Sequence, residues 1–167
     1  MIACCSRNRV IGYNGQIPWR LPADLSFFKK KTWGSAVLMG RVTWESLKGY
    51  LFPGRDMIVV TSRHRSYHID GVTFVSSPED AVALVNDAKP MFIIGGSRLY
   101  KWGLLYASYL FLTEIHGDYK GDTFFPELTS DWQEYSREAG DASNFDYQFD
   151  FVCYRNYLPK PIVFRGR

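Results

Sequence analysis

The residues best suited to chemistry lie at 11–24, in the stretch IGYNGQIPWRLPAD. The stretch holds two glycines and two prolines, which is typical of a shaped loop. It also carries several large apolar side chains, and it ends in a single carboxylate, Asp24, directly before the amphipathic run LSFFKKK. This pattern predicts a lid over a site in which Asp24 is the acid.

Asp24 has two interpretations. A carboxylate in apolar surroundings has a raised pKa and can steer the protonation of a substrate. Asp24 lies four residues before Phe28, so both side chains share one face if a helix begins at Asp24. Alternatively, Asp24 is an ordinary first-turn acid that interacts with the helix dipole, and position alone favours this second interpretation.

Several elements must position these residues. Three continuous apolar runs, each followed by a helix, predict parallel strands at 36–39, 57–60 and 91–94 that are covered on both faces. Shorter strands are expected at 2–5 and 72–75, and helices at about 25–33, at 41–48, from Ser77-Pro78 and at 97–106. Later segments alternate more, which predicts antiparallel strands at 109–115, 132–138 and 149–157. The predicted fold is α/β: one mixed domain with a mainly parallel central sheet, flanking helices and an antiparallel C-terminal edge.

Composition excludes several classes of protein. The chain has 167 residues and a formal charge of +3, but its last thirteen residues contain four basic residues and no acid. Without these four, sixteen basic residues face seventeen acidic ones, so the body of the chain lacks a basic surface for nucleic acid. We therefore expect a domain at 1–158 and a basic tail at 159–167.

The cysteines indicate the compartment. Cys4, Cys5 and Cys153 are odd in number and two are adjacent, which argues against a disulfide framework and for a reducing environment. No Cys or His spacing suits a metal site, and the N-terminus carries no long apolar run. We expect a cytoplasmic protein that is a monomer, with no metal, no membrane association and no nucleic-acid partner.

Glycines, hydroxyl groups and arginines follow the predicted parallel strands. The three segments are Gly40-Arg41, Thr61-Ser62-Arg63 and Gly95-Gly96-Ser97. Ligands of open α/β sheets sit at the carboxyl ends of strands, and helix N-termini bind phosphate. Each segment alone could be a tight turn, but together they predict a nucleotide site. The common dinucleotide motif G-x-G-x-x-G is absent, and 49–55 has glycines at phosphate-loop spacing without the required Lys-Ser/Thr.

Short motifs in matching order and spacing connect the chain to a known family. The motifs are Val10-Ile11-Gly12, Pro18-Trp19, Leu21-Pro22-Ala23-Asp24-Leu25, Phe28-Lys29, Met39-Gly40-Arg41, Thr43-Trp44-Glu45-Ser46, Pro53-Gly54-Arg55, Ile93-Ile94-Gly95-Gly96 and Gly121-Asp122-Thr123-Phe124-Phe125-Pro126. No single motif is specific, but their combination is. The chain resembles dihydrofolate reductases, most closely those of the bacterial type.

The resemblance implies NADPH-dependent reduction of 7,8-dihydrofolate to 5,6,7,8-tetrahydrofolate, by hydride transfer to C6 with protonation of N5, in support of one-carbon and thymidylate metabolism. It makes Asp24 the only ionisable side chain at the pteridine and reverses the preference for a merely structural acid. Implied catalytic residues are Asp24, Trp19, Tyr100 and Thr113. Implied substrate-binding residues are Ile2, Asp24, Phe28, Lys29, Arg55 and Thr113. Dihydrofolate and antifolate inhibitors are the implied small-molecule partners.

The resemblance also implies a site for NADPH. Its residues are Cys4, Val10, Ile11, Gly12, Gly15, Gln16, Ile17, Arg41, Val42, Thr43, Thr61, Ser62, Arg63, Gly95, Gly96, Ser97, Arg98, Leu99 and Tyr100. Arg41 and the segment 61–63 would serve the adenosine 2′-phosphate region. In this family Thr113 hydrogen-bonds the acid, and the peptide bond between Gly95 and Gly96 is cis.

The chain departs from the family pattern at four positions. Gly49 replaces a base that helps to hold the folate tail, next to one extra residue in 50–52, and Ser76 replaces a base near the 2′-phosphate. Ser97 replaces a third glycine, and Arg20 replaces a small polar residue of the lid. These changes concern tail affinity and cofactor preference rather than the reaction. Three alternatives stay open: a reductase of the riboflavin pathway, a non-catalytic nucleotide-binding relative, and a nucleic-acid binder that uses the tail.

Overall fold

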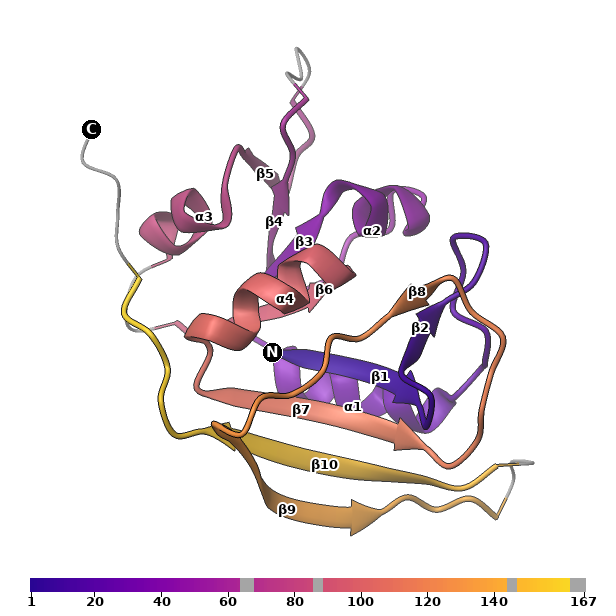
Figure 1. Ribbon diagram of the computed structural model, residues 1–167. Coiled ribbons are helices and arrows are strands. Elements are labelled where there is room, and N and C mark those ends of the chain that lie inside the picture. Colours follow the sequence, from indigo (N-terminus) through magenta and orange to yellow (C-terminus); the bar gives the residue numbers. More distant parts are fainter. Residues whose placement is uncertain (64–67, 86–88, 144–146, 163–167) are drawn as a thin grey trace.

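A computed structural model of the chain describes residues 1–63, 68–85, 89–143 and 147–162. Its elements are, in order, β1 (Ile2–Ser6), β2 (Val10–Gly12), α1 (Pro22–Thr32), β3 (Ala36–Gly40), α2 (Arg41–Ser46), β4 (Asp56–Val60), β5 (Val72–Val75), α3 (Pro78–Leu84), β6 (Met91–Gly95), α4 (Ser97–Tyr106), β7 (Tyr109–Ile115), β8 (Thr123–Phe124), β9 (Trp132–Ala139) and β10 (Phe149–Asn156) (Figure 1). Every expected strand and helix is present. Strands β2 and β8 are additional, because segments of three and two residues leave no readable period.

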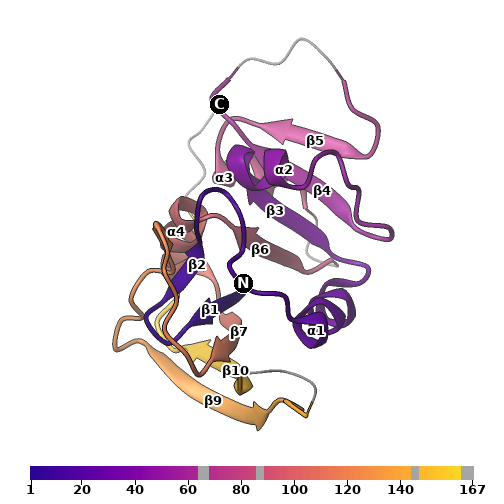
Figure 2. The same cartoon turned by 90° about the vertical axis from the view of Figure 1, so that its right-hand side faces the viewer.

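The sheet confirms the predicted mixture of parallel and antiparallel strands. In one group β3 lies between β4 and β6, β5 pairs with β4, and all these pairs are parallel. In the other group β1 pairs with β7 in parallel, and β10 pairs antiparallel with both β7 and β9. Strands β6 and β1 run next to each other and join the two groups in one layer (Figure 2). The expectation for β7 was incomplete, since this strand is parallel to one neighbour and antiparallel to the other.

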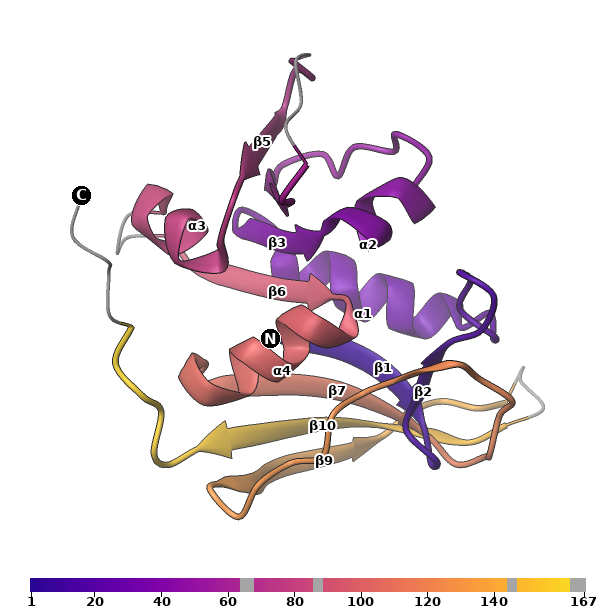
Figure 3. The same cartoon turned by 45° about the horizontal axis from the view of Figure 1, so that its top comes forward.

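Helices cover both faces of the parallel strands, which explains their uninterrupted apolar sequences. Successive side chains of a strand point to opposite faces. Leu38 of β3 therefore packs with residues of α3 and α4, whereas Val37 and Met39 pack with Trp44 of α2. Helices α3 and α4 lie on one side of the sheet and α1 and α2 on the other (Figure 3).

The start of helix α3 was predicted correctly, whereas the start of helix α1 was not. Helix α3 begins as predicted: Ser77 and Asp80 form a reciprocal capping box, and Pro78 occupies the first turn. Helix α1 begins at Pro22 instead of near residue 25, again with proline in the first turn. Asp24 is thus inside the helix, and Leu25 beside it is 56% exposed.

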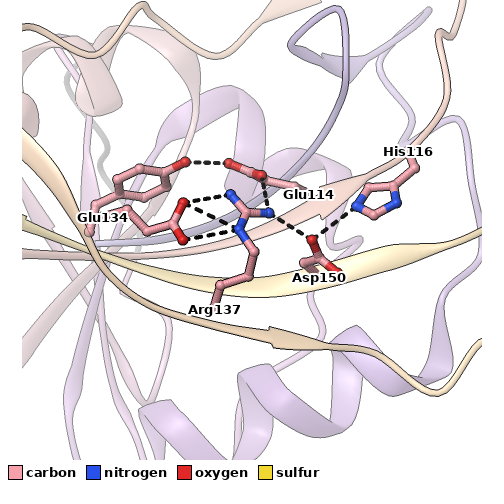
Figure 4. A network of polar contacts seen from close by, with 6 residues as sticks. Glu114, His116, Glu134, Arg137 and Asp150 are labelled. Carbon is pink, nitrogen blue, oxygen red and sulfur yellow. Dashed lines mark hydrogen bonds and ion pairs between the residues drawn. The ribbon is translucent and has the colours of Figure 1, made fainter.

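A polar network ties the antiparallel edge together, on the opposite sheet face from Asp24. It consists of one arginine, three carboxylates, one histidine and one tyrosine: Arg137, Glu114, Glu134, Asp150, His116 and Tyr154 (Figure 4). The guanidinium of Arg137 donates to Glu134, to Glu114 at 2.9 Å and to Asp150 at 2.7 Å. These contacts join β7, β9 and β10. We call this group the Arg137 network.

None of the helices in the described part of the chain is long and apolar enough to cross a membrane. The described part of the expected tail, residues 159–162, follows β10, and the backbone N–H of Lys160 donates to the carbonyl of Leu105 at the end of α4. Arg165 and Arg167, which contribute to the predicted basic character of the tail, lie outside the described residues.

Candidate active site

Asp24 belongs to α1, and its carboxylate faces β7. Thr113 of β7 is completely buried, and its hydroxyl donates a hydrogen bond of 2.6 Å to Asp24 Oδ1, the contact that the family resemblance predicts. Cys4 of β1 stands opposite Thr113 in the parallel register. The carboxylate therefore meets the sheet through one neutral donor.

The surroundings of Asp24 shift its pKa upward. Burial raises the pKa of Asp24, and the hydrogen bond from Thr113 offsets only part of that rise. Within the described residues Asp24 has no ion-pair partner. Burial likewise raises the pKa of Cys4, so its thiol stays protonated near neutral pH.

Aromatic side chains enclose the end of the lid that lies next to Asp24. Trp19 packs edge-on against Tyr119, with ring centroids 5.2 Å apart, and Tyr119 packs edge-on against Tyr147. The hydroxyl of Tyr147 donates to the carbonyl of Arg20 at 2.5 Å. Because this bond uses the backbone of Arg20, it does not depend on the unusual side chain at that position. Tyr119 and Tyr147 were not predicted, and no local pattern could have identified them.

The other end of the lid is attached to the segment that contains β8. Asp122 accepts a hydrogen bond of 2.8 Å from the backbone N–H of Asn14 and donates its own N–H to the carbonyl of Gly12. The hydrogen bond from Asn14 lowers the pKa of Asp122, which stays ionised. Ile17, between the two attachments, is largely exposed. The sequence motif contained Asp122, but its link to the lid was not predicted.

A third group of expected residues lies at the exposed end of α1. Phe28 packs edge-on against Phe52, and the Arg55 guanidinium lies over the Phe28 ring. Arg55 donates to Thr32 Oγ1 and to two backbone carbonyls, which fixes its orientation. Lys29 shares this region through its carbonyl, which accepts from Arg55, while its side chain points to solvent. The structure thus brings Phe28, Lys29 and Arg55 together.

The expected phosphate-binding residues gather where β3 and β6 end. Gly95 has a φ of 129°, which side chains rarely adopt, and a Cβ there would lie 3.3 Å from Thr43 Oγ1. The peptide bond between Gly95 and Gly96 is cis, as the resemblance predicts. Helix α4 begins directly after Gly96 with no side chain capping its first turn. Free amides and a hydroxyl group therefore lie beside a backbone that leaves room for a ligand.

The arginines expected at the 2′-phosphate are in different situations. Arg41 already forms an ion pair of 2.6 Å with Glu45, one turn further along α2. Arg63 is exposed, and its backbone N–H donates to Thr61 Oγ1 at 3.1 Å. Ser76, where the family often has a base, instead donates to Asp80 at the start of α3.

Several expected site residues expose little of their side chains. Tyr100 is buried against Phe125, and its hydroxyl donates to the carbonyl of Ile2 at 3.0 Å. Burial raises the pKa of Tyr100, so the hydroxyl keeps its proton. Val10 and Leu99 are also buried. Ile2, Val10 and Leu99 therefore present little side-chain surface in the absence of a ligand.

The arrangement of these residues agrees with a comparison to known families, in which the sequence model described as "Dihydrofolate reductase" matches residues 1–156. The chain belongs to the dihydrofolate reductase family. Dihydrofolate reductase is an NADPH-dependent oxidoreductase that reduces dihydrofolate to tetrahydrofolate, and this activity goes with the family. The resemblance seen in the sequence motifs is thereby confirmed.

Individual dihydrofolate reductases match over most of their length. The enzyme of Bacillus subtilis is 43% identical over 150 residues, covering 88% of each chain. The type 3 enzyme of Salmonella typhimurium is 42% identical over 154 residues, covering 91% of this chain and 94% of its own. A solved structure, dihydrofolate reductase from Enterococcus faecalis complexed with NADP(H) and RAB-propyl, has a TM-score of 0.85 at 34% identity and covers 93% of this chain and 94% of its own.

The residues at the strand ends of this chain fit a phosphate-bearing cofactor. The backbone at Gly95-Gly96 has no side chain where a diphosphate would approach, and the uncapped turn of α4 follows it. Arg41 and Arg63 supply positive charge on neighbouring elements. Among the described residues, no group of three or more His, Cys, Asp or Glu side chains is arranged to hold a metal ion.

Proposed function

We propose that this chain carries out the dihydrofolate reductase reaction with Asp24 as its only acid at the pteridine. The observation that supports this role is the raised pKa of Asp24. Its carboxylate accepts a hydrogen bond from Thr113 and forms no ion pair within the described chain. Asp24 and Thr113 would contact the pteridine, with Ile2, Phe28 and Trp19 around it. Trp19 would close the water-facing side next to the acid.

The reaction needs such an acid because hydride adds poorly to a neutral imine. Protonation of N5 makes C6 of the pteridine electrophilic, and a carboxylate with a raised pKa can steer that protonation. Water must enter once to deliver the proton and must then be excluded. The apolar lid residues Ile11 and Ile17 would exclude water, while the attachments of the lid at Asp122 and Tyr147 would keep it in register.

The substrate tail would extend past Phe28 to Arg55 and Lys29. Arginine binds a carboxylate through two parallel hydrogen bonds, which makes Arg55 the better anchor of the two. Its fixed guanidinium supports this assignment, whereas the Lys29 side chain points to solvent. Gly49 contributes no charge, so tail binding would depend mainly on Arg55.

NADPH would bind across the lid and the strand ends and, when bound, supplies the hydride. Cys4, Gly12, Gly15, Gln16 and the apolar lid side chains would border the nicotinamide. The segment 95–100, with Ser97 and Arg98, would hold the pyrophosphate and its ribose, and Val42-Thr43 the adjacent phosphates. Arg41, Thr61, Ser62 and Arg63 would hold the 2′-phosphate. Arg63 is the more available of the two arginines, because Arg41 must share its charge with Glu45.

Further expectations complete the proposal. The family match over 1–156 supports a catalytic domain at 1–158 followed by a separate tail at 159–167. We propose a cytoplasmic monomer that binds dihydrofolate and antifolate inhibitors and has no nucleic-acid partner. The free state of all three cysteines is compatible with a reducing compartment.

The test is the loss of NADPH absorbance in the presence of dihydrofolate, measured side by side with NADH. We expect oxidation of NADPH that depends on dihydrofolate, and a much higher KM for NADH. No oxidation at high protein concentration would refute the proposed function. Equal KM values for the two cofactors would refute the 2′-phosphate site only.

A further inference from the structure

Arg55 carries a positive charge that no acid of the described chain neutralises. Its hydrogen bonds run from Nε to Thr32 Oγ1 at 2.8 Å, and from Nη1 and Nη2 to the carbonyls of Pro53 and Lys29 at 2.6 Å each. Arginine has five N–H donors, so one remains on each terminal nitrogen. By contrast, four other arginines have carboxylate partners: Arg7, Arg9, Arg41 and Arg137. Arg55 is thus oriented by the protein and still able to receive an anionic ligand.

Two aromatic rings flank this guanidinium. Arg55 Cζ lies 5.9 Å from the centroid of the Phe28 ring and 5.3 Å from that of the Trp33 ring. Phe28 belongs to the expected substrate site, whereas Trp33 has no role in the mechanism above. Trp33 is 67% exposed, so burial of its own surface does not account for its position.

The backbone determines where the Trp33 ring lies. Trp33 directly follows α1, and the N–H of the next residue, Gly34, donates to the carbonyl of Gly54 at 2.9 Å. The indole packs so closely on Gly54 that a Cβ there would lie 2.9 Å from Trp33 Cη2. The turn that carries Trp33 is therefore tied to the loop that carries Arg55.

We propose that Trp33 is a positioning residue for the glutamate tail of the substrate. Together with the three hydrogen bonds of Arg55, its indole holds the guanidinium in the orientation that receives a tail carboxylate, and so it strengthens the preference for dihydropterins that carry the tail over those that lack it. The inference rests on the proposed function, in which Arg55 binds that tail. Without the indole, Arg55 gains rotamer freedom that must be lost again on binding. The effect falls on the binding of tailed substrates and leaves hydride transfer unchanged.

The experiment compares Trp33→Leu and Trp33→Phe with the unmodified chain, using dihydrofolate and the tail-less 6-methyl-7,8-dihydropterin. For Trp33→Leu we expect the KM for dihydrofolate to rise about fivefold, the factor that an exposed cation–π contact contributes. The kcat for both substrates and the KM for the tail-less substrate stay unchanged. Trp33→Phe restores most of the affinity because it keeps a ring over Arg55. Tyr135→Leu, which removes another largely exposed aromatic ring, is the matched control and changes nothing.

A double-mutant cycle separates positioning from general structural effects. In an Arg55→Ala background the additional Trp33→Leu change has no further effect on the KM for dihydrofolate. An additive effect, or an equal rise in KM for both substrates, would overturn the positioning role. An active unmodified enzyme with an unchanged KM in Trp33→Leu would overturn this inference alone. Absence of any dihydrofolate-dependent NADPH oxidation would instead overturn the proposed function, and the inference with it.

Discussion

Asp24 and Asp150 are both carboxylates packed against the central sheet, yet their surroundings move their pKa values in opposite directions. Burial raises the pKa of Asp24, which receives one hydrogen bond from the neutral Thr113. Burial would also raise the pKa of Asp150, but hydrogen bonds from Arg137 and His116 outweigh it and lower the pKa. Burial alone therefore does not produce a reactive acid. The decisive difference is the cation beside Asp150.

Adjacent residues of strand β7 contribute to the surroundings of both carboxylates. Thr113 of β7 points to α1 and holds Asp24, whereas Glu114 points to the opposite face and binds Arg137. The hydroxyl of Tyr154 also donates to Glu114, at 2.6 Å. The sheet thus separates the proposed catalytic acid from a network built around the cation of Arg137.

The largest expected effect is on catalysis at Asp24. Asp24→Asn should lower kcat/KM for dihydrofolate about 10²–10⁴-fold at neutral pH, because the acid that steers protonation of N5 is lost. Part of the rate should return in acid, where the substrate takes its proton from solvent. The measurement is NADPH oxidation as a function of pH.

Asp150→Asn is the matched control, with the same chemical change on the other face of the sheet, and it should leave kcat/KM near the unmodified value. If Asp24→Asn had a pH-independent rate equal to that of the unmodified chain, Asp24 would have no part in the mechanism. An equal loss in Asp150→Asn would mean that the two carboxylates are not functionally separate.

The second expected effect is on stability at the Arg137 network. Arg137→Met removes the guanidinium that Glu114, Glu134 and Asp150 share, and we expect the free energy of unfolding to fall by about 1–3 kcal/mol. The value is below that for a fully buried ion pair because the Arg137 side chain is 36% exposed. Urea unfolding measures the loss, while the KM and kcat should change little.

Arg7→Met provides the control for Arg137→Met. Arg7 pairs with Asp118 on the surface, where both side chains are largely exposed, so its removal should have little effect on unfolding. Arg137→Lys keeps the charge but not the planar fork and should fall between the two. Equal losses in Arg7→Met and Arg137→Met would contradict the special weight given to the network.

The fold and the contact of Asp24 with Thr113 could be predicted because they depend on local patterns and on one family resemblance. Continuous apolar runs predicted the parallel strands, and the capping pattern at Ser77 predicted the start of α3. Asp24 stood at the end of a recognisable loop. The helix start at Pro22 was missed because the first turn of α1 carries few apolar residues, so no period marked it.

The Arg137 network and the clamp at Tyr147 could not be predicted from the sequence. Arg137 and Glu114 are separated by 23 residues, and Tyr147 and Arg20 by 127, so no local period connects them. The contact between Trp33 and Arg55 could not be predicted either, because the two residues become adjacent only through the hydrogen bond that joins their loops. Contacts of this kind depend on strand order and register, which short motifs do not encode.

A smaller effect is expected on the free energy of unfolding, which Asp24→Asn and Asp150→Asn should change in opposite directions. A carboxylate whose pKa is raised by folding destabilises the native state when ionised, so Asp24→Asn should increase the free energy of unfolding at pH 7 by up to about 1 kcal/mol. A carboxylate whose pKa is lowered stabilises the native state when ionised, so Asp150→Asn should decrease it by about 1 kcal/mol. Urea unfolding of both variants tests this, and changes of the same sign would break the comparison.

The smallest expected effect is a difference in pH dependence. The stability changes caused by Asp24→Asn and by Asp150→Asn should disappear at different pH values. Both acids have an ordinary pKa of 3.8 when unfolded. For Asp24 the folded pKa lies above that value, so the advantage of Asp24→Asn should shrink as the pH falls through the folded pKa and should be gone near the unfolded one. For Asp150 the folded pKa lies below it, so the cost of Asp150→Asn should persist at weakly acidic pH and vanish only further into acid. Unfolding measured from neutral pH downward should therefore separate the two windows on either side of the unfolded value. If both differences faded over the same pH range, the two carboxylates would share one environment, and the cation beside Asp150 would not be what distinguishes them.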